Sequence, residues 1–184
     1  MARLPYVDPA TAPDSVREAL EAAPQLNVFR MVAHAETAFR PWLRFGGALL
    51  RSAELDARLR ELAILRVSKL TPGAEYEWVQ HVPIALAVDC TEDQVAALEA
   101  GDDAADCFSE EEQLVLRFTN EVVRDATPTD AVWNAAVTRW SPREIIELLL
   151  TIGQYMMLGR VMATTRIDID GIGGTAAVSL LPKQ

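Results

Sequence analysis

Apolar residues recur every three or four positions along most of the chain, which is the spacing of an amphipathic α-helix. In residues 53–69, for example, the leucines trace one side of such a helix. Strand-like alternation is limited to two weak candidates, residues 166–172 and 176–181. The sequence therefore predicts an all-α fold. The predicted helices cover residues 15–23, 27–36, 38–50, 53–69, 74–88, 92–100, 110–125, 130–140 and 142–165.

Several helix starts carry capping residues. The clearest is Ser141, followed by a proline and then by Glu144 in the third helical position, which is the pattern of a capping box. Thr91 and Ser109 are the expected N-caps of two further helices. Thr37 is a candidate cap for residues 38–50, and the helix over residues 53–69 is expected to begin directly after Ser52.

The chain has the size of one domain. It contains 184 residues, half of them hydrophobic, which is enough to fill a sizeable core, so residues 1–184 are treated as a single domain. Three prolines in residues 1–13 predict an extended arm, and the glycine-punctuated residues 166–184 predict an extended tail. The candidate chemistry lies between them, in residues 53–100.

Charge and cysteine content narrow the possible partners. The formal charge is 17 − 27 = −10, which disfavours phosphate backbones and anionic membranes. Cys90 and Cys107 form no CxxC pair and have no histidine at metal-ligand spacing, so we predict no metal site and no disulfide framework. No secretory signal and no uninterrupted apolar run of ~18 residues is evident. We expect a soluble, cytoplasmic protein with no nucleic-acid or membrane partner.

The candidate site is an acid and a base on one helix. Glu77 and His81 are four residues apart, so their side chains leave the same helical face one turn apart. The Pro-Gly connector at residues 71–73 predicts that the preceding helix packs antiparallel to this one. That helix carries Glu61, so three ionisable groups are expected to meet. At its ordinary pKa of ~6.5, His81 suits general acid or base catalysis.

Each of these residues also has a structural interpretation. His81 fits an ordinary core histidine held by one hydrogen bond. Glu77 fits a plain i,i+4 helix contact, and Glu61 fits a buried partner of Arg66 or Arg58.

Two further residues are candidates for substrate binding. His34 is the second histidine of the chain, and helix packing would have to bring it to the same pocket. Arg160 lies within a long apolar helix, where an unpaired charge is costly. It is expected either to pair with Glu147 or Asp168, or to bind a substrate carboxylate bidentately.

The stretch RELAILRVSKLTPGAEYEWVQHVPIALAVDCTEDQVAAL, residues 60–98, resembles the carboxymuconolactone decarboxylase and alkylhydroperoxidase D family. The resemblance implies a helical bundle around a helix-turn-helix core and assembly into a homotrimer or homohexamer. Redox members carry a CxxCxxxH motif, whose two thiol positions correspond here to Ala74 and Glu77. Both thiols are absent, so peroxidase chemistry should be lost. Tyr76, between those positions, is expected to face the pocket.

The glutamate and histidine that remain resemble the decarboxylase branch, which uses no thiol, metal or organic cofactor. The resemblance thus implies a cofactor-free acid-base enzyme, a lyase, acting on a small lactone, keto acid or related organic acid. Its catalytic residues would be His81, Glu77 and Glu61, and its substrate-binding residues Tyr76, His34 and Arg160. Two alternatives remain open: an alkylhydroperoxidase-like antioxidant protein with a degenerate thiol site, and a non-catalytic oligomeric binding protein.

Overall fold

The computed structural model describes residues 1–170, which form nine α-helices and no strand. The all-α prediction is confirmed. Of the two strand candidates, residues 166–170 form no strand, and the remainder of both, with most of the predicted tail, lies outside the described residues. The helices are α1 (Asp14–Ala22), α2 (Asn27–Val32), α3 (Glu36–Arg51), α4 (Ala57–Leu70), α5 (Glu75–Ala87), α6 (Glu92–Ala100), α7 (Glu110–Asp125), α8 (Asp130–Arg139) and α9 (Pro142–Thr165).

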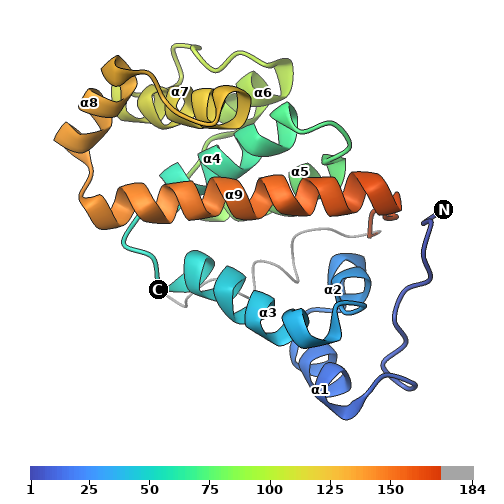
Figure 1. Cartoon of the computed structure of the whole chain (residues 1–184). Coiled ribbons are helices and arrows are strands. Elements are labelled where there is room, and N and C mark those ends of the chain that lie inside the picture. Colours follow the sequence, from blue (N-terminus) through green and yellow to red (C-terminus); the bar gives the residue numbers. More distant parts are fainter. Residues whose placement is uncertain (171–184) are drawn as a thin grey trace.

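Helix α4 is the centre of the fold. It packs most extensively against α5, α7 and α9, so it is surrounded on three sides (Figure 1). Every residue from Leu59 to Ser68 is buried as a result. Even Arg60 is only 4% exposed, although an arginine ordinarily lies on the outer side of an amphipathic helix.

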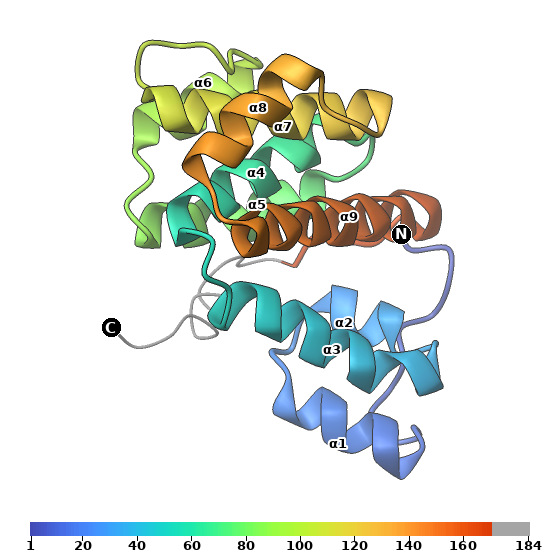
Figure 2. The ribbon, with the colours of Figure 1, turned by 60° about the vertical axis from the view of Figure 1, so that its left-hand side comes forward.

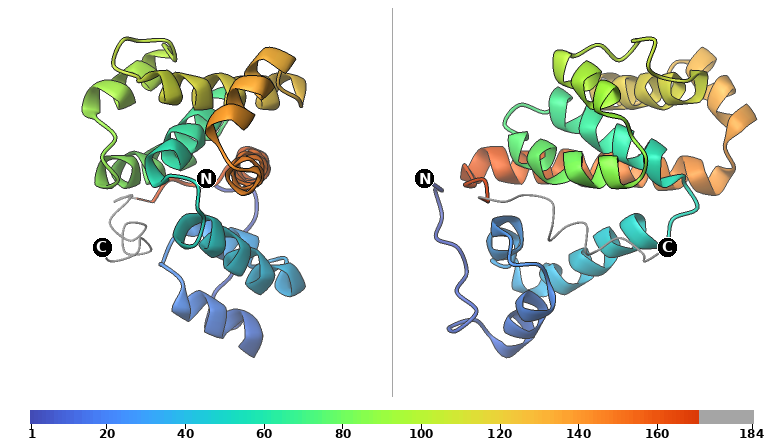
Figure 3. Two further views of the ribbon diagram at one scale, coloured as in Figure 1. Left: turned by 90° about the vertical axis from the view of Figure 1, so that its left-hand side faces the viewer. Right: turned by 180° about the vertical axis from the view of Figure 1, so that it is seen from behind.

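The first three helices form a separate layer. Helices α1, α2 and α3 lie on the side of α9 opposite to α6, α7 and α8 (Figure 2 and Figure 3). They have a small core of their own, in which Phe39 is fully buried against Val16 and Leu20. The arm before α1 runs beside the C-terminal end of α9, where the Arg3 amide donates to the Thr165 carbonyl at 2.7 Å. The two layers face each other across α5 and α9, and this arrangement creates the site.

The predicted caps were correct where a full capping pattern was present. Thr91, Ser109 and Ser141 each complete a capping box at the start of α6, α7 and α9. Two other starts were wrong. Helix α3 begins one residue before Thr37, without a side-chain cap, and α4 begins only at Ala57.

The later start of α4 has a simple cause. Asp56 accepts hydrogen bonds from the amides of Arg58 and Leu59, and so caps the helix. Glu54 precedes the helix and pairs with Arg143 of α9 at 2.6 Å. The strong cap and this contact to α9 together outweigh the weaker helical signal of the preceding residues.

Helix α9 combines a core role with an exposed apolar stripe. By length and composition it is apolar enough to cross a membrane, but half of its most apolar window is buried inside the fold, as in a core helix of a soluble protein. Ile146, Leu150 and Met157 on its outer side are 54%, 43% and 46% exposed. The helix is thus buried on one side and presents apolar side chains on the other.

The α4–α5 connector is held against α9 by two glycines. Gly73 has a φ of +80°, which favours glycine, and a Cβ there would lie 2.7 Å from Cβ of Ala163. Gly159, buried in α9, would place a Cβ 2.6 Å from Cγ2 of Thr71. These two close approaches fix where α5 starts relative to α9.

We predict that Gly159→Ala lowers the free energy of unfolding by about 1–3 kcal/mol, because the new methyl group overlaps Thr71. Gly153→Ala, the matched control in the same helix, has open space around its Cβ and should be neutral or stabilising by up to about 1 kcal/mol. Urea denaturation followed by circular dichroism measures both. Equal stabilities for the two variants would contradict the close approach.

Candidate active site

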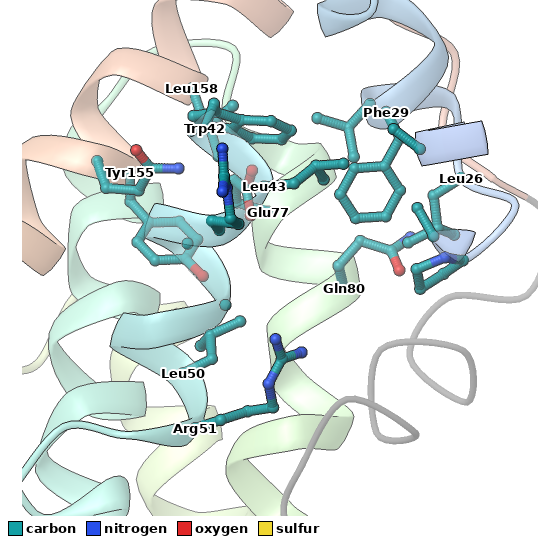
Figure 4. Close-up of a pocket in the computed structure, with 18 of the residues that line it drawn as sticks. Leu26, Phe29, Trp42, Leu43, Leu50, Arg51, Glu77, Gln80, Tyr155 and Leu158 are labelled. Carbon is teal, nitrogen blue, oxygen red and sulfur yellow. The ribbon is translucent and has the colours of Figure 1, made fainter. Parts of the chain in front are cut away.

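A cavity of about 480 Å³ lies between the N-terminal layer on one side and α5 and α9 on the other (Figure 4). Leu26, Phe29 and Leu43 make its apolar side, whereas Glu77 and Gln80 present polar groups from α5. The volume is in the range of about 300–1,000 Å³ that is usual for small-molecule sites. The cavity is therefore large enough for a small organic compound and has both apolar and polar walls.

His81 lies between two carboxylates. Its Nδ1 is 2.7 Å from Oε2 of Glu61 on α4, and its Nε2 is 3.4 Å from Oε2 of Glu77 on its own helix. Glu77 and His81 line the cavity, while Glu61 is fully buried behind the imidazole. The helix pairing predicted from the Pro-Gly connector thus brings the three groups together.

Arg60 extends this arrangement into a chain of alternating charges. Its Nε donates to Oε1 of Glu61 at 3.1 Å, on the side away from His81. Arg60, Glu61, Glu77 and His81 are each at most 5% exposed. The partner of Glu61 is thus Arg60, and neither Arg66 nor Arg58, which bond to Asn120 and Glu112.

Three polar residues of α5 are buried although several apolar residues of the same helix are not. Glu77, Gln80 and His81 are all buried, whereas Leu86 is 39% exposed and Val79 and Val82 are only partly buried. An ordinary core helix buries its apolar face. The reversed pattern shows that this face of α5 is organised around polar groups at a cavity.

The surroundings of His81 raise its pKa. Burial alone lowers the pKa, because an imidazolium is poorly solvated inside the fold, but the charge and hydrogen bond of Glu61 and then those of Glu77 outweigh this effect. The pKa rises from 6.5 to about 9. His81 is therefore an imidazolium at neutral pH, with an N–H directed to each carboxylate.

Tyr76 and Tyr155 complete the polar wall. Tyr76 is buried, lines the cavity and donates its hydroxyl to Asp170, and burial together with that carboxylate raises its pKa. The ring of Tyr155 on α9 meets the imidazole of His81 edge-on, with centroids 4.8 Å apart and planes at 85°. Burial, and then the nearby glutamates, raise the pKa of Tyr155 as well. Both phenols therefore stay neutral.

Two of the expected binding residues lie elsewhere. His34 is exposed, its Nε2 is 2.7 Å from the carbonyl oxygen of Pro5, and it does not line the cavity. Arg160 is also exposed and donates to the carbonyl of Met156, one turn earlier on α9. It contacts neither Glu147 nor Asp168, because α9 directs it away from the fold's interior. The structure brings neither His34 nor Arg160 to the cavity.

The sequence analysis missed Arg51, which lines the cavity from the end of α3. Trp42 and Tyr155 also line the cavity, and neither was among the site residues predicted from the sequence. In the sequence, the signal for Arg51 was its spacing of seven residues from Arg44. This spacing places both arginines on one side of α3, but it does not show that this side faces a cavity.

Neither cysteine is placed for thiol chemistry at this site. Burial and then the charge of Glu61 raise the pKa of Cys90 to about 12, and its Sγ donates to the carbonyl of Arg58 at 3.8 Å. Cys107 is exposed on a loop, and neither residue lines the cavity. Within residues 1–170, no group of three or more His, Cys, Asp and Glu side chains has the arrangement of a metal site.

Residues 36–121 match the model of the carboxymuconolactone decarboxylase family. The matched segment runs from the start of α3 into α7, and includes Glu61, Glu77 and His81. No curated protein matches the chain significantly.

Solved structures share the fold. The alkylhydroperoxidase AhpD core of an uncharacterized peroxidase-related protein from Ralstonia eutropha JMP134 superposes with a TM-score of 0.79, at 19% identity, over 92% of this chain and 93% of that one. An uncharacterized peroxidase-related protein from Silicibacter sp. TM1040 gives a TM-score of 0.78, at 18% identity, over 92% of each chain.

A protein of unknown function from Agrobacterium tumefaciens, proposed to be the antioxidant defence protein AhpD, gives 0.67 at 20% identity, over 75% of this chain and 94% of that one. At these identities the three likenesses show the fold. Residues 36–121, which carry the site, thus match the carboxymuconolactone decarboxylase family, and the chain shares the fold of these alkylhydroperoxidase D-like proteins.

Proposed function

We propose that the protein is a cofactor-free acid-base enzyme that moves a proton on a small lactone, keto acid or related carbonyl compound. The observation that carries this proposal is the imidazole of His81, held between two buried carboxylates at the wall of a cavity. Perturbed ionisable groups in a cavity are typical of catalytic sites. The family match supports the same chemistry, because the matched segment contains all three groups.

The raised pKa of His81 distinguishes the acid of the site from its base. An imidazolium with a pKa of about 9 is a proton or hydrogen-bond donor at neutral pH, so His81 is the acid of the site. Glu77 faces the cavity and is the base. Glu61, bonded to Nδ1, and Arg60, bonded to Glu61, hold the ring in orientation from behind, as positioning residues.

A reaction at the carbon next to a carbonyl group fits these roles. Glu77 takes the proton from that carbon, the electron pair moves onto the carbonyl oxygen, and the N–H of His81 stabilises the resulting enolate. In a β-keto acid, loss of carbon dioxide leaves the same enolate, and protonation of the carbon completes the decarboxylation. In the first route Glu77 returns the proton to the enolate at carbon or oxygen, and in the second His81 gives its proton to the carbon and regains one from water, so neither route needs an oxidant, a metal or a thiol.

Antioxidant activity is the second candidate, and the comparisons favour it through the relatives described as peroxidase-related. Peroxide reduction by thiols needs a nucleophilic thiolate and a resolving partner. Ala74 and Glu77 occupy the two thiol positions of the redox motif, and the raised pKa of Cys90 keeps that residue a thiol at neutral pH. The side chains present at the site favour acid-base chemistry.

The proposal includes a homotrimer or homohexamer in the cytoplasm. Besides the outer stripe of α9, Trp133 and Val137 on α8 are 42% and 47% exposed. Apolar surface of this kind is typical of subunit contacts. We therefore expect subunits to meet along α8 and α9, on the far side of α9 from the N-terminal layer.

Glu77→Gln and His81→Gln should each lower kcat by about 100-fold or more, because each removes one partner of the proton transfer. Release of carbon dioxide and incorporation of deuterium from heavy water, followed by NMR over a panel of small keto acids and lactones, measures the effect. Glu75→Gln is the matched control, since Glu75 is exposed in the same helical turn. Wild-type rates in both site variants would refute the assignment.

Stability should fall as the pH rises. The pKa of His81 is higher in the folded state (about 9) than its ordinary value of 6.5, so its stabilising effect is complete below pH 6.5 and is lost as the pH passes 9. The difference of the two values corresponds to roughly 3 kcal/mol. Urea denaturation between pH 6 and about pH 10 should show this loss in the wild type and not in His81→Gln. Parallel pH profiles for the two proteins would contradict it.

Replacing both Cys90 and Cys107 by serine should leave all turnover unchanged, because neither thiol reaches the cavity. Hydroperoxide consumption in the presence of a dithiol reductant should be negligible in both proteins. A wild-type peroxidase rate that disappears in the double variant would instead support the antioxidant candidate.

A further inference from the structure

Three arginines follow one face of α3 and line the cavity. Arg40, Arg44 and Arg51 are spaced by four and seven residues, so they lie on the same side of the helix. Arg40 is neutralised by an ion pair with Glu18 at 2.5 Å. Within the described part of the chain, Arg44 and Arg51 form no ion pair. A protein with a formal charge of −10 thus keeps two uncompensated cations at the edge of its cavity.

The acidic groups of the cavity do not require these cations. Arg60, Glu61, His81 and Glu77 already alternate in charge, with two cations and two anions in direct contact. The positive charge of Arg51 is therefore available to a ligand.

Arg51 occupies a defined place in the wall. Its guanidinium folds back over Gly47, so that a Cβ on Gly47 would lie 2.4 Å from Nη2 and 3.2 Å from Cζ. Figure 4 shows the side chain extending from the end of α3 into the space between α3 and α5. The absence of a side chain at Gly47 is what permits this orientation.

We propose that the cavity binds an organic monocarboxylate with an apolar body, and that Arg51 recognises its carboxylate. This rests on the proposed function, whose substrate it specifies. The planar guanidinium matches a carboxylate bidentately, and Leu50 and Trp42 on α3 with Leu158 on α9 supply an apolar surface for the body of the ligand. Arg44 adds positive charge on the same helical face.

Trp42 on α3 also lies at the cavity. Its indole Nε1 is shielded from solvent and has no hydrogen-bond acceptor among the described residues, although the residue lines the cavity. A buried N–H without an acceptor is costly. Because Nε1 has almost no accessible surface, it does not open onto the cavity, and Arg51 is the polar anchor there. Arg51 thus takes the role that the sequence analysis gave to Arg160.

The test compares 3-phenylpropanoate with its neutral amide, 3-phenylpropanamide, as probes of matched shape, by calorimetry and ligand-observed NMR at pH 7. The wild type should bind the carboxylate more tightly than the amide. Arg51→Gln should raise the Kd of the carboxylate by about tenfold or more and leave that of the amide unchanged, as expected for a charge-assisted contact. Arg117→Gln, at an exposed arginine of α7 outside the cavity, is the charge-matched control and should change neither.

Gly47→Ala gives an independent check. The new methyl group displaces only the flexible end of Arg51, so the melting temperature should not fall, yet the Kd of the carboxylate should rise several-fold. Equal affinity for the two probes in the wild type, or equal losses of both in Arg51→Gln, would overturn the proposal.

Probe binding tests the carboxylate site, whereas turnover of the Glu77 and His81 variants tests the proposed function, so the two can fail independently. If binding favours the carboxylate over the amide only when Arg51 is present, and Glu77→Gln and His81→Gln are fully active, the carboxylate site is supported and the proposed mechanism is refuted. If those two variants lose activity but the wild type binds both probes equally well, the proposed mechanism is supported and the carboxylate site is refuted.

Discussion

The contact between Glu61 and His81 is the interaction on which the rest of the site depends. A carboxylate with no solvent exposure is tolerated in a fold only if nearby charges and hydrogen bonds replace its hydration. Glu61 receives one hydrogen bond from Arg60 and one from His81. Removing either partner would leave one oxygen of this buried carboxylate without its hydrogen bond. The charge and hydrogen bond of Glu61, and then those of Glu77, keep the imidazole charged, and the contact with Glu61 fixes its orientation at the cavity wall.

The fold is arranged so that this contact is shielded on every side but one. Helix α4 carries Arg60 and Glu61 in the middle of the bundle, where α5, α7 and α9 exclude water from them. Helix α5 supplies His81, and the ring of Tyr155 on α9 covers the face of the site next to it. Only the side toward α3 remains open, and that is where the cavity lies. The low-dielectric surroundings strengthen the electrostatic effect of each group on a bound molecule.

Local signals in the sequence predicted the helices and the central pair of residues well. The spacing of Glu77 and His81, and the Pro-Gly break before them, are short-range features, so periodicity and turn chemistry were sufficient to place them on adjacent helices. The burial of Arg60 was not predictable from α4 alone, since it results from the number of helices packed around it. Arg51 was missed for the same reason: its role depends on the position of α3 opposite α5, a contact that no local pattern encodes. His34 and Arg160 were predicted at the cavity but lie elsewhere. Helical spacing shows on which side of a helix a residue lies, but not whether that side faces the cavity or solvent.

One contact described above links the edge of the site to the far end of the described chain. Asp170 accepts the hydroxyl hydrogen of Tyr76 and also the backbone amide of Asn27, at 3.0 Å, at the start of α2. A single carboxylate thereby ties the segment after α9 to α5 and to α2, which stand on opposite sides of the cavity. The spacing of those two walls is thus coupled to the position of a residue about 90 positions downstream of both His81 and Tyr76. A residue just after α9 therefore helps to hold the two walls of the cavity at their observed spacing.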